Sequence, residues 1–151
     1  MKKNLTFRLF AAIAIIALTG CGDSTEDKLY GTWQAVEEDA TTTLALADDY
    51  SACLIMAFPK PEGFIEGVGS WQLAESASGK EVIECKFSSY KAGGAWNKVD
   101  ALKFFELSWN KKYELAKRNH EVYGFFIVSL GTDSLTTRDA DGSLTRWHRV
   151  D

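Results

Sequence analysis

The chain has 151 residues, of which 17 are Lys or Arg and 21 are Asp or Glu, so its formal net charge is −4 at pH 7. This length is sufficient for one domain with a hydrophobic core. The acidic balance argues against a nucleic-acid-binding protein, because such proteins use a basic surface to neutralise phosphates.

The first twenty residues have the features of an export signal. Lys2, Lys3 and Arg8 precede an apolar run over residues 9–18, and no acidic residue occurs before Asp23. A basic start, a short apolar run and small residues at the end are typical of a signal peptide. Ten helical residues span about 15 Å, half of a bilayer core of roughly 30 Å, so this run is too short for a transmembrane anchor.

The quartet at residues 18–21, Leu-Thr-Gly-Cys, resembles the bacterial lipobox. The resemblance implies that Cys21 is acylated and becomes the mature N-terminus, which would tether the protein to a membrane without spanning it. Gly22 in place of Asp after the cysteine implies the outer membrane, facing the periplasm. The alternative is a plain signal peptide with an incidental cysteine. We therefore expect a signal peptide (1–20), an acylated tether (21–29) and one domain (30–151).

Removal of residues 1–20 takes away three basic residues and no acidic residue, which leaves 14 basic against 21 acidic residues and a net charge of −7. Such a surface repels nucleic acids and anionic lipid headgroups. The expected membrane attachment therefore depends on the N-terminal lipid.

Two further cysteines, Cys53 and Cys85, remain in the exported part of the chain. An oxidising compartment favours a disulfide between them, and closing a loop of about 33 residues would stabilise the fold by roughly 3–4 kcal/mol. The alternative is two buried free thiols, because both cysteines lie in apolar stretches.

Segments with strand character alternate with short turn-rich stretches after residue 29. They are residues 30–38, 51–58, 63–75, 81–87 and 121–130, followed by a hairpin over 134–150 whose turn is marked by Asp141-Gly142. Three glycines in 63–75 predict a bent or bulged strand.

Residues 99–119 fit both a helix and a strand hairpin. Helical spacing aligns one apolar stripe with Asp100 as a plausible N-cap; the stripe is Val99, Leu102, Phe105, Trp109, Tyr113 and Ala116. Strand spacing places Ala101, Phe105, Leu107 and Trp109 on one face, with a turn before residue 113. Strands on both sides favour the hairpin.

Eight or nine sequential strands predict an all-β fold, an up-and-down antiparallel meander that closes into a small barrel. Closure removes the exposed strand edges that promote aggregation. This architecture leaves room for one short helix near residues 100–118.

Several residues resemble the motifs of lipocalins, the calycin-type barrels. Gly31-Thr32-Trp33 is similar to the glycine-x-tryptophan motif that opens the first strand, and Thr132-Asp133 is similar to the start of the second motif, although Ser134 stands where tyrosine is expected. The resemblance implies a lipocalin-like barrel in which the tryptophan closes one end. Arg146 or Arg149 would then lie over its ring in a cation–π contact.

No catalytic, metal-binding or cofactor-binding pattern stands out. The two histidines, His120 and His148, lack metal-ligand spacing, and neither a nucleophile elbow nor a phosphate-binding loop occurs. We therefore expect no enzyme activity and no cofactor.

Two functions that involve binding remain, and the sequence assigns ligand-binding residues to neither. In the first, the barrel binds a small hydrophobic ligand. In the second, a barrel filled by its 17 aromatic residues binds another envelope protein through its outer surface or loops, for which Phe64 and Trp96 are candidate contacts.

Overall fold

The computed structural model describes residues 24–76, 78–112, 123–139 and 142–151. These residues form two helices and eight strands. The helices are α1 (Thr25–Leu29) and α2 (Lys98–Lys112). The strands are β1 (Gly31–Val36), β2 (Thr41–Leu46), β3 (Ser51–Pro59), β4 (Glu62–Glu75), β5 (Glu81–Gly94), β6 (Tyr123–Leu130), β7 (Ser134–Arg138) and β8 (Leu144–Arg149).

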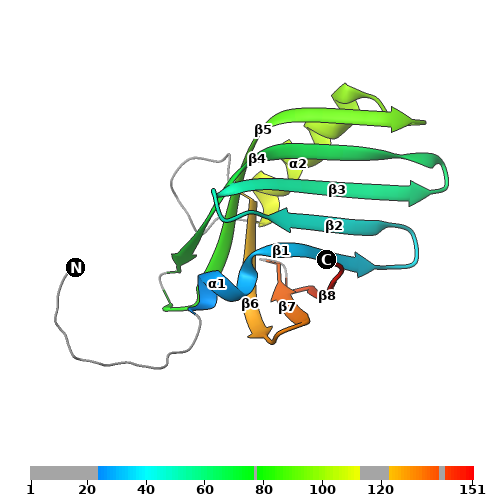
Figure 1. Cartoon of the computed structure of the whole chain (residues 1–151). Coiled ribbons are helices and arrows are strands. Elements are labelled where there is room, and N and C mark those ends of the chain that lie inside the picture. The colour runs from blue at the N-terminus through cyan, green and yellow to red at the C-terminus, as the bar shows by residue number, and fades with distance from the viewer. Residues whose placement is uncertain (1–23, 77, 113–122, 140–141) are drawn as a thin grey trace, which may run out of the picture.

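Each strand pairs antiparallel with the next strand along the chain, and β8 returns to pair with β1 (Figure 1). The closing register aligns Trp33 with Arg149 and Gln34 with His148. The predicted up-and-down meander that closes into a barrel is therefore confirmed, with eight strands among the described residues.

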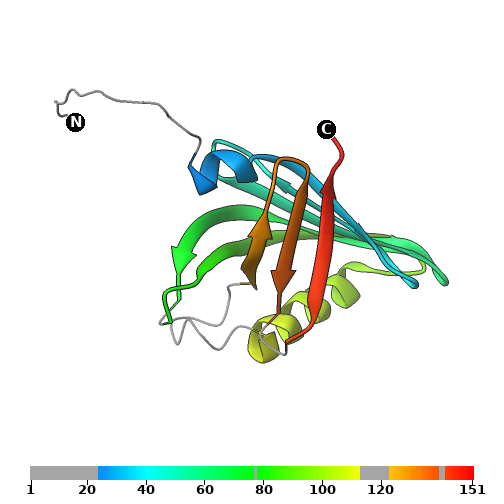
Figure 2. The same ribbon diagram turned by 90° about the horizontal axis from the view of Figure 1, so that it is seen from below.

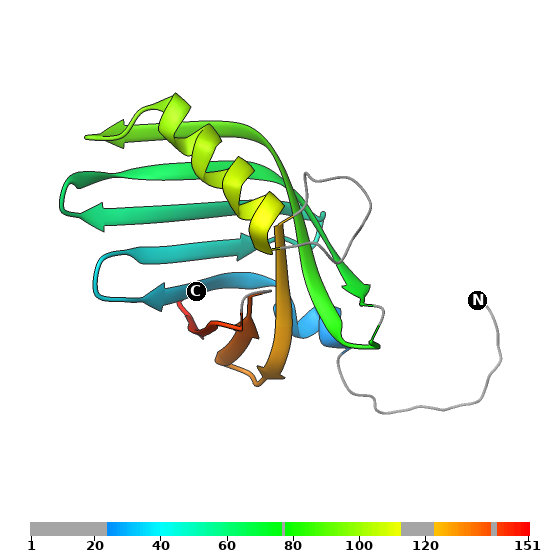
Figure 3. The same ribbon diagram turned by 180° about the vertical axis from the view of Figure 1, so that it is seen from behind.

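The barrel is uneven, because β4 and β5 are much longer than β6, β7 and β8. The pairing between β5 and β6 covers only Val82–Cys85 of β5. The rest of β5 faces α2, which lies along the base of the barrel in Figure 2 and across β4 and β5 in Figure 3. The fully buried Phe105 of α2 packs against Phe87 and Tyr90 of β5, with ring centroids 5.0 and 5.5 Å apart.

Alternation along the strands directs one row of side chains from each strand into the barrel. Near α1 these side chains form a buried core cluster. The clustered residues there include Trp33, Leu46, Trp71, Ile83, Cys85 and Leu135, each at most 3 % exposed.

Part of the predicted tether is folded. Ser24 is the N-cap of α1, since its hydroxyl accepts a hydrogen bond from the Asp27 backbone N–H (3.1 Å) and the Asp27 carboxylate accepts one from the Ser24 N–H (3.3 Å). The side chain of Leu29 is fully buried in the core. Residues 25–29 therefore belong to the domain, whereas Cys21 and the predicted signal peptide lie outside the described residues.

The preferred strand hairpin over residues 99–119 is wrong for residues 99–112, which lie in α2, and the alternative of a helix is confirmed there; residues 113–119 lie outside the described part. The helix begins after Asn97, whose side-chain oxygen accepts from the Asp100 N–H while the Asp100 carboxylate accepts from the Asn97 N–H. The N-cap is thus Asn97 and not Asp100. The buried face carries Ala101 and Phe105, whereas Val99 of the predicted stripe is 60 % exposed.

Two strands depart from the sequence prediction. The strand β2 was not predicted from the sequence, and β5 extends beyond its predicted end at residue 87 through Gly94 in the glycine-rich stretch. The predicted irregularity in β4 is confirmed as a shift of register between Val68 and Gly69. A side chain on Gly69 would collide with the Lys86 carbonyl of β5, so the close approach of the two backbones requires glycine.

Cys53 and Cys85 are free thiols, which corrects the predicted disulfide. Cys53 points to the outer face of β3, where its thiol donates a hydrogen bond to Glu66 (3.3 Å). Cys85 is fully buried inside the barrel on β5. Since β4 separates the two strands and the side chains lie on opposite faces of the sheet, no disulfide can join them.

Candidate functional site

A cavity of about 340 Å³ opens at the end of the barrel away from α1. It lies between the first residues of β2, the last residues of β3, the start of β6 and the β7–β8 hairpin, with α2 beside it. A volume of this size fits a small organic ligand.

Five aromatic side chains form the inner wall of this cavity; they are Phe58, Phe104, Tyr123, Phe125 and Trp147. Phe125 packs edge-to-face on Trp147 (5.7 Å between centroids) and stacks obliquely on Tyr123 (4.9 Å). The Trp147 indole N–H donates to the buried Thr137 hydroxyl at 2.9 Å. The aromatic wall is therefore held in place by its own packing and by a satisfied polar group.

Carboxylates line the outer part of the same cavity. Glu37 and Asp39 come from the β1–β2 loop, and Asp139 comes from the β7–β8 loop. Both loops are held by backbone hydrogen bonds, from Glu37 N–H to the Ala40 carbonyl and from Asp139 N–H to the Ser143 carbonyl, each 2.9 Å. Among the described residues that line the cavity, none is Lys, Arg or His.

The other end of the barrel is closed by the motif residues singled out in the sequence. Trp33 is fully buried, and its indole N–H donates to the Leu29 carbonyl at the end of α1 (2.9 Å). The guanidinium of Arg149 lies over the Trp33 ring, 4.3 Å from its centroid. The predicted cation–π contact is therefore confirmed for Arg149, whereas Arg146 is exposed three residues earlier on β8.

Arg149 also joins three segments of backbone. Its Nε donates to the Thr132 carbonyl (2.9 Å), its Nη2 donates to the Lys28 carbonyl (2.7 Å), and its Nη1 donates to the Tyr30 carbonyl. The last carbonyls of a helix lack partners within the helix, so Arg149 and the Trp33 indole together cap α1. The Thr132-Asp133 stretch is thereby brought to Gly31 and Trp33.

Gly31 makes this arrangement sterically possible. Its φ of +129° favours glycine, and a side chain there would collide with the Arg149 guanidinium. The glycine, the tryptophan and Arg149 therefore act together in closing the barrel.

A tyrosine–carboxylate cluster attaches α1 to the β2–β3 turn. The Tyr50 hydroxyl donates to Glu26 (2.7 Å), and Tyr30 donates to the same oxygen (3.3 Å). The hydrogen bond and the charge of Glu26 favour the neutral phenol and raise the pKa of Tyr50 to about 12. Tyr50 has a left-handed φ of +67°, and its carbonyl accepts the Trp71 N–H at 2.9 Å.

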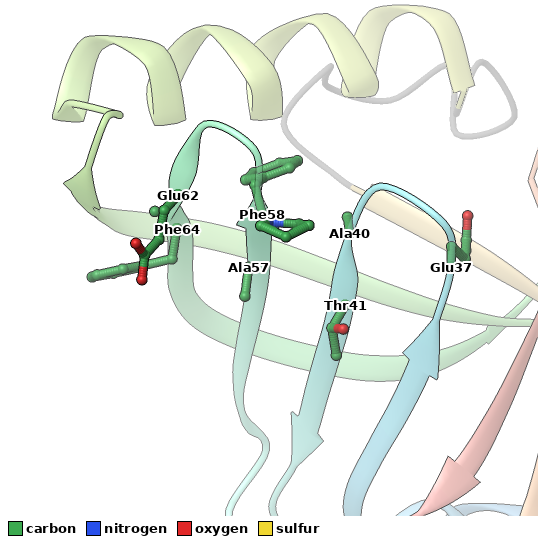
Figure 4. A pocket seen from close by; sticks show the side chains of 9 residues that line it. Glu37, Ala40, Thr41, Ala57, Phe58, Glu62 and Phe64 are labelled. Carbon is green, nitrogen blue, oxygen red and sulfur yellow. The ribbon is translucent and has the colours of Figure 1, made fainter.

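An open groove of about 620 Å³ crosses the outer ends of β2, β3 and β4 next to the cavity (Figure 4). The two candidate protein-contact residues lie at this corner. Phe64 lines the groove from β4, and its ring lies against Gly93. Trp96 packs on Phe58 with 4.7 Å between the ring centroids, so both aromatic residues are partly covered by the fold.

The residues that line the cavity were not predictable from the sequence. Strand alternation indicates that Tyr123, Phe125 and Trp147 share the inner face, but all inward residues of a barrel have this pattern. Only the pairing of β6 with a short part of β5 and the position of α2 show that one end stays open.

Among the described residues, no three His, Cys, Asp or Glu side chains gather in a way that could hold a metal ion. Within the same ranges, neither helix has the length and apolar character needed to cross a membrane.

The described residues thus form an eight-stranded up-and-down antiparallel barrel with one end closed by Trp33 and Arg149 and an aromatic cavity at the other. No protein-family model, curated protein or solved structure matches the chain.

Proposed function

We propose that this protein is a lipid-anchored protein of the cell envelope that binds a small hydrophobic ligand non-covalently in the open end of its barrel. The observation that supports ligand binding is the cavity of about 340 Å³ with its wall of five aromatic side chains. A fully packed interior would leave no space for a ligand, whereas this cavity provides such a space at the end of the barrel away from α1.

The proposed location depends on the sequence at residues 1–21. The export-signal features and the lipobox-like quartet support acylation of Cys21 and attachment to the outer membrane, facing the periplasm. The arrangement of Gly31, Trp33 and Arg149 supports a lipocalin-like character of the barrel, in which such an open end holds the ligand.

A matched pair of substitutions on β2 tests the proposed site. Thr42 points into the cavity, whereas its neighbour Thr43 points outward and accepts a hydrogen bond from Gln34. Thr42→Phe should fill part of the cavity and exclude a ligand, while Thr43→Phe adds the same volume outside.

The full chain and both variants are purified from the membrane, and the small molecules released on denaturation are compared by mass spectrometry. We expect one molecule in the wild type and in Thr43→Phe that is depleted in Thr42→Phe. The same set of molecules from all three proteins would contradict ligand binding in the cavity.

The alternative function is a protein-interaction module without a small-molecule ligand, and the open groove across β2, β3 and β4 favours it (Figure 4). Crosslinking in the envelope separates the two functions. Under the alternative, one partner protein is captured through a crosslinker at Thr41 in the groove, and no molecule depends on Thr42.

A further inference from the structure

We propose that the ligand of the barrel cavity is a small amphipathic cation, an apolar body that carries an ammonium-type group. This inference rests on the proposed function, since it concerns the same cavity, and it adds the charge that the ligand must carry.

The first argument is the charge of the cavity lining. Three acidic residues, Glu37, Asp39 and Asp139, line the cavity together with its aromatic wall, and no basic residue joins them among the described lining residues. Carboxylates attract a cation within the Debye length and repel an anion, and this effect is stronger beside a low-dielectric wall than in open water. A fatty acid, whose carboxylate would enter this lining, is therefore disfavoured.

The second argument is the chemistry of the wall. The faces of Trp, Tyr and Phe rings carry negative charge density and bind cations, especially quaternary ammonium groups. Trp147, Phe125 and Tyr123 form one packed wall, with 5.7 and 4.9 Å between successive ring centroids. Aromatic faces and carboxylates therefore favour the same sign of ligand charge.

The third argument is the relative position of the two groups. Inward side chains of β3 such as Leu54 and Met56 also line the cavity, and they suit an apolar body. The acidic residues lie on two loops at the open end, where a charged group keeps part of its hydration. An amphipathic ligand would thus keep its cation beside the carboxylates and aromatic rings of the lining and its body against the aliphatic side chains, without burying an unpaired charge.

The test uses three probes that share one aromatic body and differ in charge: benzyltrimethylammonium, benzyl alcohol and benzoate. The full chain, labelled with fluorotryptophan and reconstituted in lipid nanodiscs, is titrated with each probe. Trp147 lines the cavity, so its fluorine resonance, assigned by Trp147→Phe, reports binding there and is insensitive to probe that enters only the lipid. We expect the ammonium to bind at least about tenfold more tightly than benzoate, with the alcohol between them.

The double variant Glu37→Gln with Asp39→Asn should weaken binding of the ammonium by about three- to tenfold and leave the alcohol unchanged. The matched control is Asp48→Asn with Glu75→Gln, which changes net charge equally but alters exposed residues at the other end of the barrel. This control should retain the preference for the cation.

Three results overturn the inference. They are equal or tighter binding of benzoate or benzyl alcohol, an equal loss in both double variants, and no shift of Trp147 by any probe. In each case a molecule that still depends on Thr42 leaves the proposed ligand-binding function standing. Without such a molecule, ligand binding itself is refuted.

Discussion

Replacement of Arg149 by methionine tests how the barrel is closed. The substitution keeps an unbranched side chain that can lie along Trp33 but removes the guanidinium. It deletes one cation–π contact and three hydrogen bonds to the carbonyls of Thr132, Lys28 and Tyr30.

The expected loss follows from these contacts. Each hydrogen bond contributes about 0.5–1.5 kcal/mol net, and an exposed cation–π contact about 0.5–1 kcal/mol. The bonds to the Thr132 and Lys28 carbonyls are exposed, so water replaces them in part. We therefore expect Arg149→Met to lower the free energy of unfolding by about 2–4 kcal/mol.

The matched control is Arg146→Met, the same substitution three residues earlier on β8, where the side chain is exposed. Surface substitutions of this kind change stability by about 0.5 kcal/mol or less. Urea unfolding followed by tryptophan fluorescence gives both values, and with a slope of about 1–3 kcal/mol per molar urea the Arg149 variant should unfold at a concentration lower by about 1 M or more. Equal midpoints for the two variants would refute the role of Arg149 in closing the barrel.

Three further predictions concern Gly31, the Tyr50–Glu26 pair and the thiols. Gly31→Ala should destabilise the protein by about 1–3 kcal/mol in the same urea assay, because the left-handed φ and the overlying guanidinium exclude a methyl group; an unchanged midpoint would contradict this. The hydrogen bond to Glu26 raises the pKa of Tyr50 to about 12 from an unfolded value near 10. The stability of the wild type relative to Tyr50→Phe should therefore be constant below pH 10 and fall as the pH rises to 12, and a difference that persists at pH 12 would exclude the proposed bond. Burial raises the pKa of the Cys53 thiol to about 11 and also raises that of Cys85, so iodoacetamide should label Cys53 slowly at neutral pH and Cys85 only after unfolding; an intact-mass change on reduction would instead reveal a disulfide.

Features encoded by local patterns were predictable from the sequence. Alternating apolar residues and short turn signals indicate antiparallel strands, and sequential strands of this kind pair with their neighbours, so the barrel followed from them. Gly31 and Trp33 were identifiable because their positions accept few residue types. The positive φ at position 31 favours glycine, and the buried site at position 33 holds a large indole.

Features that depend on segments distant in the sequence were not predictable. Arg146 and Arg149 have the same charge and lie three residues apart on β8, so their side chains point to opposite faces of the strand. The β1–β8 register then aligns Arg149 with Trp33. The sequence alone does not show whether Cys53 and Cys85 can form a disulfide. The sheet places their side chains on opposite faces, with β4 between their strands.

The helix α2 and the cavity also depend on contacts between segments distant in the sequence, so neither was predictable from local patterns. Apolar residues in 98–112 fit the periodicity of a helix and that of a strand. The part of β5 that does not pair with β6 is covered by α2, whose Phe105 packs against Phe87 of β5. This contact between distant segments favours the helix. Strand alternation determined which side chains face inward, but the lengths of β6–β8 and the position of α2 decided which end of the barrel holds the cavity. Local sequence thus determines strand formation and the direction of side chains, whereas enclosed space depends on contacts between segments far apart in the chain.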